Sequence, residues 1–254
     1  MGDGVVSRKS TGVIGLDDKM EGGFVEGSVV LVRGKAGTGK TAFACSFLYK
    51  GALEGEPGLY VTTEEEVEDI KSDIKKMFGW DLDSLVRKGL LKFLSIRPAI
   101  ARNIRADEID QAIRLYTINL FSEISETIKV INAKRVVIDT VSIIEMFIHN
   151  RYLSRVSLMN LTKNLKSLGV TTILTEGVSE EGGLLGDEAL TEFIADAVIK
   201  LDFVPVSERF KRTLTITKMR RTNHSTFIHP FDFTENGLKL VEFGRGAMEG
   251  AENQ

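Results

Sequence analysis

The chain has 254 residues, 43% of them hydrophobic, which is enough to bury a large core. Its formal net charge of −3 and its pI of about 5.8 exclude the general attraction for nucleic acid or anionic membranes that a strongly basic protein has. The single cysteine, Cys45, excludes an internal disulfide, and no apolar run is long enough to span a membrane. We therefore expect a cytoplasmic protein with one domain over residues 1–243 and a disordered tail over residues 244–254.

The first strongly patterned segment is LVRGKAGTGKTAF, which runs from Leu31 to Phe43. The apolar run at residues 29–32 predicts a buried strand, and residues 41–53 predict a helix rich in Ala, Phe and Leu. Between them, residues 34–41 match the pattern G-x-x-x-x-G-K-S/T, in which glycines let backbone amides surround a phosphate at the helix N-terminus. The expected nucleotide-binding residues are Gly34, Lys35, Ala36, Gly37, Thr38, Gly39, Lys40, Thr41 and Ala42.

Farther along the chain, predicted strands alternate with predicted helices. Short apolar runs predict strands at residues 59–63, 90–96, 135–139 and 170–176. Periodic apolar residues predict helices at residues 67–81, 106–130 and 152–168. The apolar face of the first of these helices is expected to contain Val67, Ile70, Ile74 and Met77. From residue 197 onward, apolar runs joined by short polar loops predict antiparallel strands, so the fold class is α/β with a mostly parallel central sheet, helices on both faces and antiparallel C-terminal strands.

Three of the predicted parallel strands end in acidic residues, at the edge where open α/β sheets bind ligands. Asp139 follows the apolar run VVI at residues 136–138 and matches a Walker B aspartate, which would hold Mg²⁺ together with Thr41. A strand that ends in Asp is a weak signal alone, but it gains weight beside a phosphate-binding loop. Lys40 is expected to reach the β- and γ-phosphates, so ATP and Mg²⁺ are the expected cofactors.

The remaining acids at the strand ends each allow two interpretations. Glu64 and Glu65 are expected to orient and deprotonate the attacking water in phosphoryl transfer. Alternatively, the run EEEVED forms the solvated first turn of a helix, where acids suit the helix dipole. Glu176 would either sense the γ-phosphate or simply cap its strand.

With the segments VTTEE, RVVIDTVS and KMRRTNHS added to the loop, the chain resembles the KaiC-like branch of the RecA/RadA superfamily, in the group that includes archaeal RadA paralogues. The resemblance extends from STGVIGLDDKMEGGF near the N-terminus to HPFDFTENGLKL near the C-terminus. It implies a RecA-like P-loop NTPase fold and slow, Mg²⁺-dependent ATP hydrolysis, with Glu64 and Glu65 as the catalytic acids. It also implies a homo-oligomer, expected to be a hexameric ring with ATP between its subunits.

The resemblance further implies that each nucleotide contacts residues of the neighbouring subunit. Lys218 and Arg220 would reach that nucleotide across the junction, where a cation stabilises the transferring phosphoryl group. Without the resemblance, both would be interpreted as solvated strand charges. Arg221 departs from the family, which usually has glycine at this position. The other residues expected to line the neighbour's base and ribose are Met219, Thr222, His224, Thr234 and Glu235.

Three functional classes fit these features, and none of them involves a membrane. The first is a nucleotide-driven regulator or scaffold that binds an unidentified protein, and the second is a recombination accessory that binds single-stranded DNA. We favour the first, because the segment from Glu176 to Ile199 contains seven acids and no Lys or Arg. An acidic surface of this kind repels DNA phosphates. The third is an assembly protein that binds nucleotide without hydrolysing it, which the paired Glu64 and Glu65 argue against. The acids of this segment are Glu176, Glu180, Glu181, Asp187, Glu188, Glu192 and Asp196.

Overall fold

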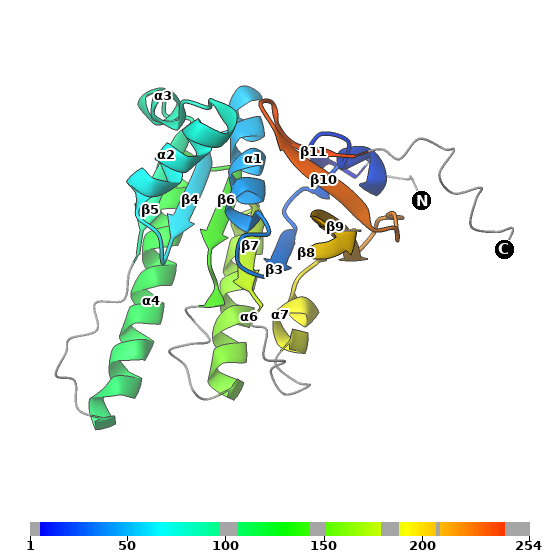
Figure 1. The fold of residues 1–254 in the computed structure, drawn as a ribbon. Coiled ribbons are helices and arrows are strands. Elements are labelled where there is room, and N and C mark those ends of the chain that lie inside the picture. Colours follow the sequence, from blue (N-terminus) through cyan, green and yellow to red (C-terminus); the bar gives the residue numbers. More distant parts are fainter. Residues whose placement is uncertain (1–5, 97–105, 143–150, 179–187, 207–208, 242–254) are drawn as a thin grey trace, which may run out of the picture.

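The computed structural model describes residues 6–96, 106–142, 151–178, 188–206 and 209–241, so the expected tail lies outside the described residues. The strands of its nine-stranded central sheet are β3 (Val29–Gly34), β4 (Gly58–Thr62), β5 (Leu91–Ser95), β6 (Arg135–Asp139), β7 (Thr171–Gly177), β8 (Ala197–Val206), β9 (Arg209–Met219), β10 (His229–Thr234) and β11 (Gly237–Leu240). Across the sheet they follow the order β11-β10-β9-β8-β3-β7-β6-β4-β5 (Figure 1).

Helices lie on both faces of this sheet. They are α1 (Lys40–Leu53), α2 (Val67–Phe78), α3 (Leu82–Arg87), α4 (Ala106–Ile131), α6 (Arg151–Ser167) and α7 (Glu188–Ile194). Near the N-terminus, a short sheet of β1 (Arg8–Lys9) and β2 (Phe24–Val25) flanks the 3-10 helix η1 (Asp17–Met20). The long predicted helices are confirmed, whereas helices α3 and α7 are too short for a periodic pattern to reveal them. Strand β10 was also missed, because its segment HPFDFT is not a continuous apolar run. Within the described ranges, no helix is both long enough and apolar enough to cross a membrane.

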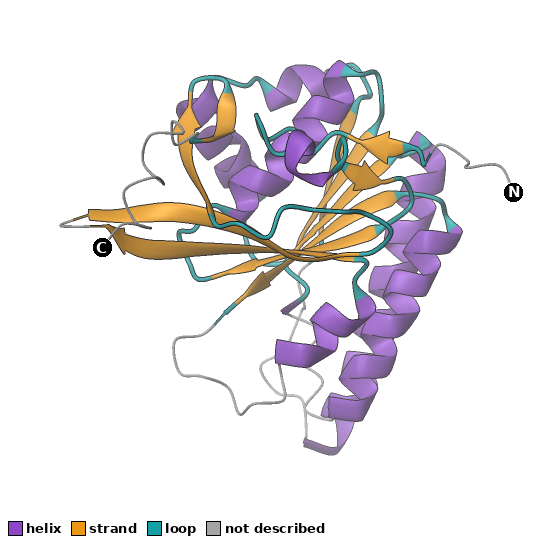
Figure 2. Cartoon of the chain, turned by 90° about the vertical axis from the view of Figure 1, so that its right-hand side faces the viewer, coloured by secondary structure: helices purple, strands orange, loops and turns teal. Residues whose placement is uncertain are grey.

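The predicted change from parallel to antiparallel pairing is confirmed, with β8 as the turning point. Strands β5, β4, β6, β7, β3 and β8 pair in parallel, and β8, β9, β10 and β11 pair antiparallel. Strand β8 therefore belongs to both parts, although the sequence pattern assigned it to the antiparallel part. Strands β8 and β9, of 10 and 11 residues, extend beyond the helices (Figure 2).

Side chains alternate between the two faces of the sheet and so build two separate cores. In β3, Val30 and Val32 pack in the core that contains the buried residues of α1 and α2. Val29 and Leu31 pack in the core on the other face, which contains the buried residues of α4 and α6. The two faces of one strand therefore carry different neighbours, and this alternation continues to the ends of the strands where the expected site lies.

The buried face of α2 differs from the predicted one, because Phe78 is buried in place of Met77 and Val67 is only half-buried. Ile70, Ile74 and Phe78 follow one another at i+4 spacing and are buried, whereas Met77 is 39% exposed. The sequence pattern placed Met77 in the core because it also falls at helical spacing from Ile70. The exposed Met77 side chain instead faces the pocket described below.

A buried arginine fastens the end of the sheet that lies away from the loop after β3. Arg135 begins β6 and is 0% exposed, and its guanidinium donates to Glu54 at 2.6 Å, to Glu56 at 2.7 Å and to two backbone carbonyls. Gly51 of α1 makes room for it, since a Cβ there would lie 2.4 Å from the Arg135 Cδ. Lys9 of β1 pairs with the same Glu56. The buried charge is thus compensated by carboxylates, as a charge removed from water requires.

The turn after β9 holds a residue in a conformation that favours glycine. Arg221 has a φ of 59°, in the left-handed region that costs a non-glycine residue about 1–2 kcal/mol. This is the position at which the sequence departs from the glycine usual in the family that it resembles. The departure therefore has a cost in backbone strain.

We expect Arg221→Gly to raise the free energy of unfolding by about 1 kcal/mol, because glycine adopts positive φ without a steric penalty. Urea unfolding followed by circular dichroism measures the change. Arg221→Ala is the matched control, because it removes the same charge and keeps a Cβ. Equal gains in both variants would show that the charge, and not the backbone, is responsible.

Candidate nucleotide-binding site

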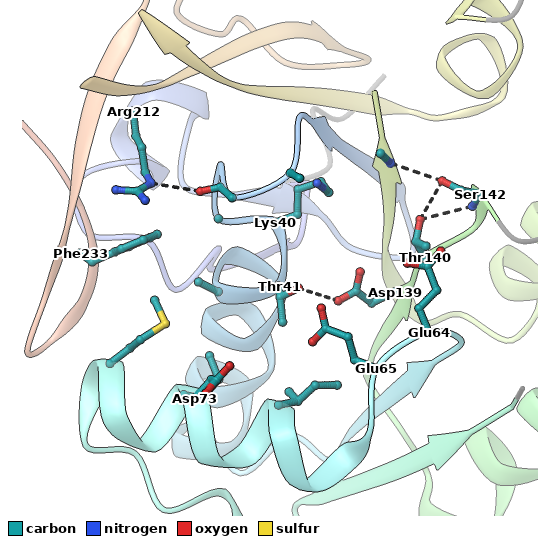
Figure 3. A pocket seen from close by; sticks show the side chains of 18 of the residues that line it. Lys40, Thr41, Glu64, Glu65, Asp73, Asp139, Thr140, Ser142, Arg212 and Phe233 are labelled. Carbon is teal, nitrogen blue, oxygen red and sulfur yellow. Dashed lines mark hydrogen bonds between the residues drawn. The ribbon is translucent and has the colours of Figure 1, made fainter. Parts of the chain in front are cut away.

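A pocket of about 830 Å³ opens where β3, β4, β6 and β7 end (Figure 3). Its volume is within the range of small-molecule sites in proteins. The loop after β3, the segment after β4, helix α2 and strands β9 and β10 all contribute to its walls. The expected site residues that line it are Ala36, Gly37, Gly39, Lys40, Thr41, Ala42, Glu64, Glu65 and Asp139.

The loop between β3 and α1 needs its glycines for two different reasons. Gly37 and Gly39 have φ of 77° and 108°, which residues with a Cβ rarely adopt. At Gly34 the constraint is space, because a Cβ would lie 2.4 Å from the carbonyl oxygen of Leu201. Thr38 is buried and its hydroxyl donates to the backbone carbonyl of Lys35 at 2.8 Å, which ties the loop to itself. The loop is therefore shaped before any ligand arrives.

Lys40 begins α1 and lies over this loop. Its Nζ donates to the carbonyl oxygens of Gly34 at 2.9 Å and Lys35 at 3.0 Å. Burial lowers the pKa of the Lys40 amine, and the nearby carboxylates, chiefly Asp139, oppose that shift. The helix N-terminus and the amine together make this end of the pocket suited to an anion such as a phosphate.

Asp139 lies at the centre of a group of hydroxyls. Thr41 Oγ1 donates to Asp139 Oδ2 at 3.0 Å (Figure 3). The hydroxyls of Tyr60 and Thr175 also donate to this carboxylate. Burial, followed by the charge of Asp139, raises the pKa of Tyr60 well above its usual value, so its hydroxyl stays a donor. Carboxylate and hydroxyl oxygens are the ligands that Mg²⁺ prefers.

The donors present fit a magnesium ion that is shared with a ligand. Within the described part of the chain, no group of three or more His, Cys, Asp or Glu side chains could hold a metal by itself. Mg²⁺ commonly takes one or two protein ligands and completes its octahedron with phosphate oxygens and water. Thr41 and Asp139, side by side at the loop, suit that mode of binding.

Glu64 and Glu65 lie between β4 and α2, at the mouth of the pocket. Helix α2 begins at Val67 with Glu66 as its N-cap, so the alternative that they form a first helical turn is wrong for these two residues. Figure 3 shows Glu65 directed toward Asp139 and Thr41. Partial burial raises the pKa of the Glu65 carboxyl, and the surrounding carboxylates, Asp139 first among them, add to the rise.

Glu176 lies on the face of the sheet opposite to Asp139. Thr175 faces Asp139 and donates to it, so the next residue along β7 points to the other side. There Glu176 is 5% exposed, accepts a hydrogen bond from Thr191 at 2.6 Å and pairs with Arg33 at 3.4 Å. Glu176 is not among the residues that line the pocket, so the structure does not support a γ-phosphate sensor at this position.

The sequence analysis missed the residues that close the pocket on the side of β9 and β10. Arg212 Nε donates to the carbonyl oxygen of Gly37 at 3.3 Å, and its guanidinium lies 4.6 Å from the ring centre of Phe233 (Figure 3). Phe233 packs over Gly39, where a Cβ would approach its ring to 2.9 Å. No local pattern marks Arg212, because its contact with the loop depends on how β9 is placed in the sheet.

The chain shares its sequence pattern with a known family over nearly its whole length. The model of that family, described as "ATPase: KaiC", matches residues 9–244. The chain belongs to the KaiC family. This membership confirms the resemblance inferred from the motifs and agrees with a RecA-like fold built on a mostly parallel sheet.

KaiC-family relatives of two lengths are similar to this chain. The circadian clock oscillator protein KaiC of Parathermosynechococcus lividus is 36% identical over 245 residues, which are 96% of this chain and 44% of that protein. A UPF0273 protein of Aeropyrum pernix is 35% identical over 253 residues, which are 95% of this chain and 98% of that protein. This chain thus spans less than half the length of the clock protein and nearly all of the shorter relative.

A solved KaiC-like structure has the same fold. The crystal structure of the KaiC-like protein PH0186 from Pyrococcus horikoshii superposes with a TM-score of 0.77 at 36% sequence identity. The match covers 93% of this chain and 100% of that one. The identity is high enough for the likeness to support family membership as well as the fold.

Lys218 and Arg220, which we expect at a junction between subunits, lie away from the loop of their own chain. Met219 pairs with Ala197, which is level with the start of β3, whereas the loop follows Gly34 at the end of β3. Lys218 pairs with Val198, which is level with Leu31. At about 3.3 Å per residue, Lys218 and Met219 lie about 10 and about 13 Å from Gly34 along the sheet. Such a separation is what a contribution to another subunit's site would require.

The other residues expected at the junction differ in how far their side chains are buried. Met219 is 8% exposed, and its side chain packs in the core. Its backbone, at the end of β9, can still take part in a contact between subunits. The remaining residues of this group have exposed or partly exposed side chains; they are Thr222, His224, Thr234 and Glu235.

The acids after β7 carry less free charge than the sequence suggested. Glu176 pairs with Arg33, and Asp196 pairs with Lys166 of α6 at 2.7 Å. Residues 179–187, which include three of the acids counted in the sequence, lie outside the described residues. Paired carboxylates repel phosphates less than free ones, so the charge count is a weaker argument against DNA binding than it seemed.

The raised pKa of Glu65 predicts how stability changes with pH. Folding disfavours the charged carboxylate, so its charge lowers stability at pH values above the raised pKa, and this cost disappears below the ordinary value of 4.5, where the group is protonated in both states. We therefore expect Glu65→Gln to raise Tm at about pH 7 and to leave it unchanged at about pH 4. Glu68→Gln, at an exposed position of α2, is the control, and an equal gain there would contradict the explanation.

Proposed function

We propose that this chain is a Mg²⁺-dependent ATPase that binds ATP in the pocket, assembles into a homo-oligomeric ring and acts as a nucleotide-driven regulator or scaffold for a protein partner. One observation carries the ATPase part of this proposal. Lys40, Thr41, Asp139 and Glu65 come from three separate segments and converge on one pocket at the strand ends, in a chain of the KaiC family.

Each of these residues has a role that its position supports. The loop amides and Lys40 would bind the phosphates, while Thr41 and Asp139 would hold Mg²⁺, which neutralises phosphate charge when bound. Glu65, with Glu64 beside it, would orient the attacking water and accept its proton. A carboxyl with a raised pKa suits this work, because general bases are most effective when their pKa approaches the working pH.

The ring part of the proposal rests on the separation along the sheet between the loop after β3 and the two cations, Lys218 and Arg220. Lys218 and Arg220 would stabilise the transferring phosphoryl group in the site of the next subunit, and a hexamer is the ring that the family resemblance favours. ATP bound at such a junction would favour assembly by mass action. A partner protein, not DNA, remains the favoured target of the ring.

Binding of single-stranded DNA as a recombination accessory is the second hypothesis. The pairing of Glu176 and Asp196 with basic residues supports keeping it, because it removes part of the expected repulsion. A titration with single-stranded and duplex DNA at several salt concentrations, with and without ATP, separates the two hypotheses. Salt-sensitive binding that requires ATP would favour the accessory over the regulator.

We expect Lys40→Ala to lower ATP affinity by about a hundredfold or more, because several charge-assisted hydrogen bonds to phosphate are lost. Isothermal titration calorimetry with Mg·ATP measures the effect. Lys50→Ala is the matched control, since Lys50 lies on the same helix, is partly exposed and does not line the pocket. Unchanged affinity in a folded Lys40→Ala chain would remove the phosphate-loop assignment.

We expect the Glu64→Gln, Glu65→Gln double variant to bind Mg·ATP and to lose about a hundredfold in turnover, the usual scale for loss of a general base. Steady-state phosphate release and a binding titration are measured on the same preparation. The control pair, Glu66→Gln with Glu68→Gln, alters the next acids along the chain, which lie outside the pocket. Near-normal turnover in the first variant, despite binding, would leave the acids without a catalytic role, whereas a wild-type chain that binds ATP without turnover would favour the non-hydrolysing assembly protein.

A further inference from the structure

Arg33 connects the phosphate-binding loop to helix α7. It precedes Gly34 directly, and its side chain, 8% exposed, lies on the face of the sheet away from α1. The guanidinium pairs there with Glu176 of the neighbouring strand at 3.4 Å and with the Glu192 carboxylate of α7. A guanidinium with several donors in a fixed plane can hold two carboxylates at once. Helix α7 is therefore fastened to the strand that leads into the loop.

The last turn of α7 holds the two cations expected to serve the next subunit. Lys218 Nζ donates to the carbonyl oxygens of Glu192 at 2.7 Å and Phe193 at 3.3 Å. Arg220 donates to the Phe193 carbonyl at 3.5 Å and lies 3.7 Å from the Asp196 carboxylate. Carbonyls at a helix C-terminus attract cations. They hold together two like charges that would otherwise repel each other.

Glu192 belongs to both sets of contacts. Its side chain binds Arg33, and its backbone carbonyl binds Lys218. Moving the side chain away from Arg33 would let α7 shift, and the carbonyls that fix Lys218 and Arg220 would shift with it. A displacement of about 1 Å in a group that positions a reacting phosphate can cost on the order of a hundredfold in rate.

We propose that Glu192 is a positioning residue: through its pairing with Arg33 it sets where α7 holds Lys218 and Arg220, and so prepares the face that completes the neighbour's site. This inference rests on the proposed function, because it requires that the two cations act across a junction. It adds a residue that does not touch the nucleotide and that no local motif marks. It also connects β3, which leads into the loop of one subunit, to the cations that would act in the site of the next subunit.

The first test is Glu192→Gln in the full chain, which keeps the size of the side chain and removes its charge. We expect turnover to fall by about tenfold, because a network contact that positions other groups is changed and the reacting groups are not. Glu123→Gln, at an exposed position of α4, is the matched control and should stay at the wild-type rate. Turnover of Glu192→Gln within about twofold of this control would overturn the proposal.

The second test asks whether Glu192→Gln damages the face of the junction that carries the acids or the face that carries the cations. A general loss of stability would not distinguish between these two faces. Mixed with the Glu64→Gln, Glu65→Gln variant under conditions of subunit exchange, Glu192→Gln should regain activity, since about a quarter of the junctions in a one-to-one mixture pair an intact acid face with an intact cation face. Mixed with Arg220→Ala, it should regain none, because both carry the same damaged face. Equal recovery with both partners, or recovery with neither in rings confirmed by mass, would overturn the proposal.

A third variant covers the case in which Glu192→Gln does not fold. Arg33→Lys keeps a cation but cannot hold both carboxylates in one plane, so we expect a smaller loss with the same dependence on the mixing partner. Failure of the proposed function gives a different pattern. If a chain with both Lys218→Ala and Arg220→Ala is fully active, no cation acts across the junction, and the ring part of the proposed function falls together with the role of Glu192. If Arg220→Ala is inactive while Glu192→Gln and Arg33→Lys are normal, only the role of Glu192 is lost.

Discussion

Successive side chains of a strand point to opposite faces of the sheet. At the ends of β3, β6 and β7 this alternation decides on which face each polar or charged side chain lies. In β6 and β7 it turns Asp139 and Thr175 toward α1 and the loop after β3, where Thr41 and Thr175 both donate to Asp139. In β3 and β7 it turns Arg33 and Glu176 to the other face, where they meet α7. A shift of one residue in the register would exchange these two sets, so the pocket and the ion pairs beneath it depend on the same strand pairing.

This arrangement separates the chemistry of the chain into two regions. The side of the sheet that carries α1 holds an anion-binding loop, oxygen ligands for a hard cation and a carboxylate with a raised pKa. The C-terminal turn of α7, near the opposite end of β3, presents two cations held by backbone carbonyls. Neither region alone has all the groups that phosphoryl transfer uses. The proposal of a shared site follows from this division, since a neighbouring copy would supply what each lacks.

The site residues that could be predicted are those that belong to a short contiguous pattern in the sequence. The loop from Gly34 to Thr41, the Walker B Asp139 and the acids after β4 are contiguous patterns, and they come together because parallel strands end at one edge. Arg212 could not be found this way, since its contact with Gly37 comes from the placement of β9. Met77 was assigned to the core because two neighbouring positions of a helix fit the same apolar spacing. The fold class was predictable from alternation alone, whereas short elements such as α3 were not.

The ion pairs around Arg135 make stability at the end of the sheet away from the pocket depend on pH in a different way from stability at the pocket. Burial raises the pKa of Glu56, but hydrogen bonds from Lys9 and Arg135 outweigh it and hold the value below the ordinary 4.5. The stability that this carboxylate contributes is therefore present above that ordinary value and is lost as the pH falls through the lowered one. Because these contacts join β1 to the start of β6, acid would loosen the N-terminal segment. Unfolding in acid would then start at the end that a bound nucleotide does not touch, and such a ligand would protect the chain less against acid than against heat.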